Sequence, residues 1–70
     1  MEMIQEGDIL IFEDGTELKV DLIEYYPHDG HTIQYIEGTS GKKKTYTCVD
    51  NGLDDSQTGL NGRIIKCLRP

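Results

Sequence analysis

The stretch that decides the fold is residues 9–20, which reads I-L-I-F-E-D-G-T-E-L-K-V. It opens on a short apolar run and closes on Glu17-Leu18-Lys19-Val20, where charged and apolar residues alternate as in a half-buried strand. Between them, Asp14-Gly15 supplies the positive φ that a tight hairpin turn demands. The stretch therefore predicts two antiparallel strands, at about residues 8–12 and 17–26, joined by a turn.

The second of these strands changes phase within its own length. Leu18, Val20 and Leu22 share one face of an extended chain, but Ile23 and Tyr25 are the next apolar positions. A shift of one residue moves every following side chain to the opposite face of a sheet. We therefore expect a β-bulge or a sharp bend inside this strand.

Turn residues divide the rest of the chain into three further strands. Those segments are rich in Ile, Val, Thr and Tyr, which favour strands over helices. The predicted strands cover residues 31–37, 43–49 and 62–68, with turns at 27–30 and 38–41. The polar connection at 50–61 has room for one short 3₁₀ turn.

Five short strands with a bent second strand predict an all-β fold, a small barrel in which closure removes the exposed sheet edges. Over residues 7–68 the number and spacing of the strands resemble the SH3-like barrels, and this resemblance is one of architecture. An OB-like barrel and a partly open β-sheet are the alternatives. We expect residues 1–70 to form a single domain.

Composition limits the classes of protein to consider. The 70 residues are 36% hydrophobic and 29% charged, a balance that suits a small folded domain with a modest core. The longest apolar run is the four residues Ile9–Phe12, far short of the roughly 20 that a membrane helix needs. Residues 1–6 lack the basic and apolar regions of a secretory signal, which predicts a cytoplasmic protein with Cys48 and Cys67 as thiols.

No residue pattern indicates catalysis or a metal site. His28, His31, Cys48 and Cys67 are the plausible soft ligands, but they lack the paired spacing of a structural zinc site. No nucleophile, base and orienting residue form a recognisable motif. A chain this short also leaves little volume for a concave pocket. We therefore expect no enzyme activity, no metal and no cofactor.

The charge distribution suggests a protein partner. Residues 1–41 hold ten acidic residues and one basic residue, within a chain whose net charge is −6. An excess of acidic residues favours docking on a basic partner. Tyrosine is enriched at protein interfaces. Our leading hypothesis is a non-catalytic protein-binding module, a small acidic regulator or inhibitor. Its predicted contact residues are Glu17, Asp21, Tyr25, Tyr26 and His28.

A nucleic-acid-binding barrel is the alternative function. Residues 42–70 hold six basic residues and three acidic ones. Cations beside exposed aromatic rings bind phosphate backbones and stack bases. The predicted surface for this function consists of Lys42, Lys43, Lys44, Tyr46, Arg63 and Lys66. For either function we expect a monomer or a weak homo-oligomer.

Overall fold

A computed structural model describes residues 3–50, 57–58 and 62–70 of the chain. All of its regular elements are strands, which confirms the all-β prediction. Five strands lie within two residues of the predicted starting points, and a sixth, β5, was not predicted. The bounds are β1 Ile9–Phe12, β2 Glu17–His28, β3 His31–Ser40, β4 Lys43–Asp50, β5 Gln57–Thr58 and β6 Ile64–Leu68.

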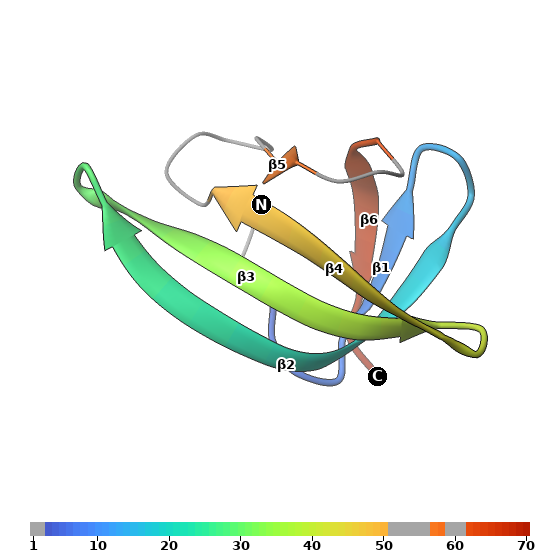
Figure 1. Cartoon of the computed structure of the whole chain (residues 1–70). Coiled ribbons are helices and arrows are strands. Elements are labelled where there is room, and N and C mark those ends of the chain that lie inside the picture. The colour runs from blue at the N-terminus through green and yellow to red at the C-terminus, as the bar shows by residue number, and fades with distance from the viewer. Residues whose placement is uncertain (1–2, 51–56, 59–61) are drawn as a thin grey trace.

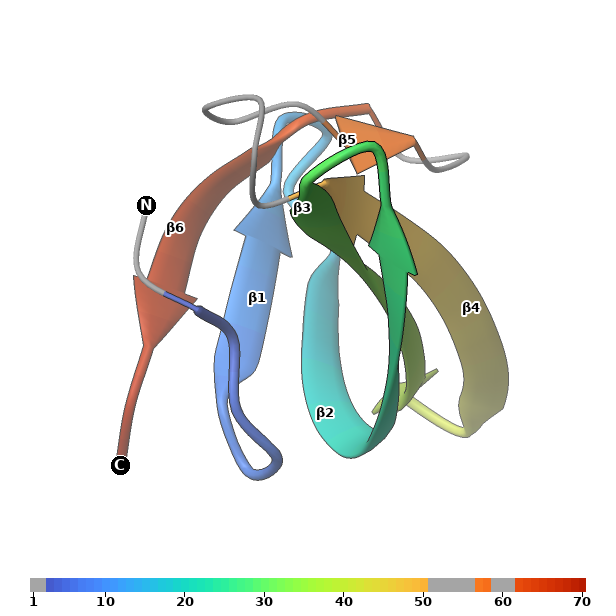
Figure 2. The same cartoon turned by 90° about the vertical axis from the view of Figure 1, so that its left-hand side faces the viewer.

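The strands form one antiparallel sheet in the order β5-β4-β3-β2-β1-β6 (Figure 1). The first four strands are a meander, and β6 returns to pair with β1. The sheet curls strongly, so that β4 faces β6 and β1 across the interior (Figure 2). It is nevertheless not closed, because β5 and β6 occupy its two ends and do not pair with each other. The predicted closed barrel is therefore replaced by the partly open sheet.

A register shift between Val20 and Leu22 confirms the predicted bulge in β2. It lies one residue earlier than the sequence suggested, so Leu22 points outward and Ile23 into the core. The first part of β2 pairs with β1, and the remainder pairs with β3 alone. The bulge thus allows one long strand to bend and to pair with β1 at its start and with β3 along the remainder.

The turns are shorter than predicted at two of the three hairpins. β2 continues to His28, and Asp29 and Gly30 alone make the turn, with φ of 48° and 84°. Positive φ at both central residues defines the type I′ turn that matches strand twist. Pro27 is tolerated in β2 because this part of the strand pairs with β3 only. The next turn is likewise confined to the two residues between β3 and β4.

The core lies inside the curl of the sheet. It is built from inward-facing residues of β1, β2, β3, β4 and β6, together with Ile4 from the segment before β1. The buried apolar residues are Ile4, Leu10, Phe12, Leu18, Val20, Ile23, Ile36, Val49 and Ile64. The Gln34 side chain is also buried, and its Nε2 donates to the Ile4 carbonyl at 2.9 Å. The segment before β1 therefore contributes to the core through Ile4.

The predicted 3₁₀ turn falls in the connection at 50–61, most of which lies outside the described residues. Within it, β5 pairs Thr58 with Cys48 and Gln57 with Val49. A helix with the length and apolar character needed to cross a membrane does not occur in the described part of the chain.

Candidate functional site

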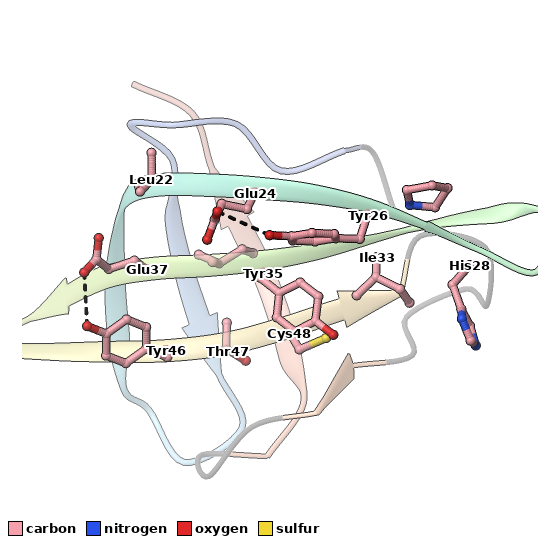
Figure 3. Close-up of a pocket in the computed structure, with 12 residues that line it drawn as sticks. Leu22, Glu24, Tyr26, His28, Ile33, Tyr35, Glu37, Tyr46, Thr47 and Cys48 are labelled. Atoms are coloured by element: carbon pink, nitrogen blue, oxygen red, sulfur yellow. Dashed lines mark hydrogen bonds between the residues drawn. The ribbon is translucent and has the colours of Figure 1, made fainter.

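A groove of about 840 Å³ lies on the outer face of β2, β3 and β4, away from the core (Figure 3). Its volume falls within the range of about 300–1,000 Å³ that ligand sites usually have. It is lined by Leu22, Glu24, Tyr26, Pro27, His28, Ile33, Tyr35, Ile36, Glu37, Tyr46, Thr47 and Cys48. The expectation that so short a chain leaves little volume for a concave pocket of this size was wrong. The hollow lies on the surface of the twisted sheet and takes no volume from the core.

Strand register explains why these side chains meet. Leu22 pairs with Glu37, which pairs with Tyr46 on the next strand. One row further along, Glu24 pairs with Tyr35, which pairs with Cys48. Because alternate residues of a strand share a face, both rows project from the same side of the sheet. The bulge in β2 is required for this arrangement, because it brings Leu22 and Glu24 onto the outer face.

Aromatic side chains dominate the groove and remain accessible. Tyr26 and Tyr35 make an edge-to-face contact with ring centroids 5.3 Å apart. About half of each of these two residues is exposed, and Tyr46 is 69% exposed. Leu22 and Ile33 add aliphatic surface at the sides. Exposed aromatic and aliphatic side chains gathered in one hollow are typical of a binding surface.

Two carboxylates are held within this aromatic surface. The Tyr46 hydroxyl donates to Glu37 Oε1 at 3.1 Å, and the Tyr26 hydroxyl donates to Glu24 Oε2 at 3.4 Å (Figure 3). The described residues that line the groove include no Lys or Arg. The groove is therefore negatively charged while its walls are aromatic, a combination that favours cationic ligands.

Charges next to the groove are already paired. Asp21 precedes Leu22 in β2, and its Oδ2 accepts a hydrogen bond of 2.6 Å from the Thr39 hydroxyl of β3. Lys44 Nζ of β4 lies 3.6 Å from the same oxygen. The Thr39 hydroxyl above all, and then the Lys44 ammonium, hold the pKa of Asp21 below its usual range. The Lys44 charge is thus largely offset by Asp21 and does not neutralise the groove.

The predicted protein-contact residues lie on different faces and at different positions of β2. Tyr26 and His28 line the groove, whereas Tyr25 projects from the opposite face of β2. Glu17 begins β2 opposite Ile11 of β1, and Asp21 lies in the bulge. The five predicted contact residues therefore do not form one continuous surface. Tyr26 and His28 are its two members that the groove brings together.

The predicted basic residues are also spread over the sheet. Lys42, Lys43 and Lys44 lie at the hairpin between β3 and β4, whereas Lys66 lies on β6 opposite Ile11. Three strands separate β4 from β6 in the sheet order. Arg63 precedes β6, and its backbone N–H donates to Glu13 Oε1 at 2.7 Å beside the first hairpin. Tyr46 belongs to the groove, where its hydroxyl is bonded to a carboxylate.

The groove residues that reasoning from the sequence missed include Leu22, Glu24, Ile33, Tyr35 and Glu37. The signal that would have found them is the alternation of residues 33, 35 and 37 along one strand. Read together with 22, 24 and 26 across the hairpin, this alternation places all of them on one face. The exact position of the bulge was needed to align the two strands.

The remaining soft ligands do not form a cluster with these residues. The His28 and His31 rings make an edge-to-face contact at the turn between β2 and β3, with centroids 5.8 Å apart. Both cysteines are half-buried: Cys48 lies in the groove, and Cys67 lies opposite Leu10 of β1, where its thiol donates to Asp8 Oδ2 at 3.3 Å. In the described ranges, no three His, Cys, Asp or Glu side chains are grouped as a metal site would require.

Function therefore has to be inferred from the chemistry of the groove. Its walls are aromatic, it contains two carboxylates, and it is open along three strands. Comparisons of the chain with protein-family models, curated proteins and solved structures find no match.

Proposed function

We propose that the chain is a non-catalytic protein-binding module, a small acidic regulator or inhibitor that docks on a basic surface of a larger protein. The observation that carries this proposal is the groove on β2, β3 and β4, which places exposed tyrosines around Glu24 and Glu37. Aromatic rings supply contact area at low entropic cost, and unpaired carboxylates favour a partner that carries Lys or Arg.

The architecture supports a binding role. The order β4-β3-β2-β1-β6 and the bend in β2 favour an SH3-like arrangement, although the sheet is open. Such an arrangement presents the outer face of the long strands to solvent. A cytoplasmic location is part of the same proposal.

Nucleic-acid binding has weaker support. The carboxylates of Glu24 and Glu37 in the groove would repel phosphate, and Lys44 is paired with Asp21. The hairpin lysines Lys42 and Lys43 are exposed and lie apart from Arg63 and Lys66, which belong to the other end of the sheet. Binding of a nucleic acid is therefore a result that would contradict the proposal.

The test compares two acetylated and amidated octapeptides, one alternating Lys with Val and the other alternating Glu with Val. Each is titrated into ¹⁵N-labelled protein and followed by amide chemical shifts. We expect the Lys peptide to shift amides of residues 22–28, 33–37 and 46–48, and the Glu peptide to cause no shifts. Absence of binding by the Lys peptide, or binding of a single-stranded oligonucleotide that a K43E/K44E variant loses, would overturn the proposal.

A matched pair of variants locates the interaction. Tyr25 and Tyr26 are neighbours on β2, each 49% exposed, but they lie on opposite faces of the sheet. We expect Tyr26→Ala to weaken binding of the Lys peptide by about tenfold, because it removes an aromatic wall of the groove. Tyr25→Ala should leave the affinity unchanged. The reverse result would move the binding surface to the other face.

A further inference from the structure

We propose that the groove recognises an extended segment of the partner protein in which two arginines occupy alternate positions, an Arg-x-Arg sequence. Glu24 would accept one guanidinium and Glu37 the other. The inference rests on the proposed function and specifies its partner: a peptide segment read by the spacing of its positive charges.

The first argument is the unused hydrogen-bonding capacity of the two carboxylates. An ionised carboxylate can accept about four hydrogen bonds. In the structure Glu37 accepts one from Tyr46, and Glu24 accepts one long bond from Tyr26. Neither carboxylate forms an ion pair with a described Lys or Arg. Both therefore retain the acceptors that a planar guanidinium engages in pairs.

The second argument is the distance between the carboxylates. Glu24 lies directly opposite Tyr35, and Glu37 lies two residues further along β3. Residues placed diagonally in this way across an antiparallel pair are about 7–8 Å apart. Alternate residues of an extended chain are separated by about 6.6–6.8 Å and point to the same side. An Arg-x-Arg segment thus matches the diagonal, whereas adjacent arginines point to opposite sides.

The third argument concerns the type of cation. The tyrosine that donates to each carboxylate also places a ring beside it: Tyr26 at Glu24 and Tyr46 at Glu37 (Figure 3). A guanidinium stacks on an aromatic face while its edge donates to a carboxylate. A lysine ammonium is a compact charge that cannot do both with the same geometry. Arginine is therefore expected to bind more tightly than lysine at either position.

The experiment uses two isomeric peptides, acetylated and amidated, with sequences Gly-Thr-Val-Arg-Thr-Arg-Val-Thr-Gly and Gly-Thr-Val-Arg-Arg-Thr-Val-Thr-Gly. They have equal charge and composition, so only the spacing of the arginines differs. Isothermal titration calorimetry on the full chain should give a Kd about fivefold lower for the alternating peptide. This ratio is what one additional exposed ion pair contributes to the affinity. Replacing both arginines of that peptide by lysine should raise the Kd.

Variants of the protein assign the two contacts. Glu24→Gln and Glu37→Gln should each weaken binding of the alternating peptide by about fivefold and remove the preference over its isomer. Glu6→Gln, which neutralises an exposed acidic residue outside the groove, should preserve that preference. Far-UV circular dichroism confirms that each variant is folded.

The outcomes separate this inference from the proposed function. Equal affinity for the two isomers, with the loss in Tyr26→Ala retained, would overturn the recognition of spacing and leave a basic-peptide groove in place. Binding of neither isomer at millimolar concentration would overturn the groove as a site for basic partners, and the spacing inference with it.

Discussion

At the scale of single residues, the Asp8 side chain combines deep burial with several hydrogen bonds. It is 1% exposed, and its carboxylate accepts hydrogen bonds from Arg69 Nε and Nη2, both at 3.0 Å. The Gln5 backbone N–H and the Cys67 thiol donate to the same carboxylate. Arg69 also donates to the Met3 carbonyl at 3.2 Å. These bonds join the segment before β1 to the segment after β6.

The bonds to Asp8 predict a specific dependence of stability on pH. The Arg69 guanidinium above all lowers the pKa of Asp8 from 3.8 to about 2 in the folded protein. Between these values the unfolded chain binds more protons, so the stabilisation is present above about pH 4 and is lost as pH falls towards 2. Asp8→Asn should therefore cost about 1–2 kcal/mol at pH 6 and progressively less below pH 4.

Urea unfolding followed by circular dichroism at several pH values measures this difference. Glu6→Gln provides the control, because Glu6 is exposed in the same segment. Its effect on the free energy of unfolding should be within about 0.5 kcal/mol. A penalty for Asp8→Asn that stays constant from pH 6 to pH 2 would show that the ion pair with Arg69 does not set the stability.

At the scale of elements, β2 and β3 approach each other very closely where β2 bends. Gly38 lies opposite Val20, next to the bulge. A Cβ added at Gly38 would lie 2.6 Å from the Lys19 carbonyl oxygen and 2.7 Å from the Leu18 side chain. The lack of a side chain at Gly38 therefore allows the two strands to pack around the bend, which in turn places Leu22 and Glu24 in the groove.

This close contact predicts that Gly38→Ala is strongly destabilising. The new methyl group would force apart a backbone oxygen and a buried leucine, at a cost of about 2–3 kcal/mol. Gly41→Ala is the control, because a Cβ there meets nothing within 4 Å, but the φ of 64° is strained for alanine. That strain costs about 1 kcal/mol. Chemical denaturation should rank the two variants in this order, and equal losses would mean that the strands around Gly38 shift to accommodate the new methyl group.

The elements were largely predictable because their signals are local. Asp14-Gly15 marked the first hairpin, and the change of phase between Leu22 and Ile23 marked the bulge in β2, which lies one residue earlier. The lengths of the turns were less predictable: Pro27 was assigned to a turn, but it lies in β2, where only one side of the strand is paired. The groove could not be assigned, because Tyr35 and Glu37 are brought to Glu24 and Tyr46 by pairing between strands.

At the scale of the whole molecule, the open sheet depends on short segments to complete its core. β5 and β6 are not paired with each other, so closure of the sheet does not seal the interior. The segment before β1 contributes to the core: Ile4 is fully buried, and its carbonyl accepts a hydrogen bond from the buried Gln34 side chain. This long-range contact was not visible in the sequence, where residues 1–6 have no strand pattern.

Ile4 and Met3 provide the test of this dependence, because they are neighbours with opposite exposure. Ile4 is 0% exposed and Met3 46% exposed. Ile4→Ala should lose about 2–4 kcal/mol by leaving a cavity among core residues, a large part of the stability of so small a domain. Met3→Ala retains the carbonyl that Arg69 binds and should lose less than about 1 kcal/mol. Thermal unfolding should therefore separate the variants by about 4 °C or more, since about 1 kcal/mol shifts the midpoint of a 60–100-residue domain by about 4–8 °C. Similar midpoints would mean that the sheet alone supports the fold.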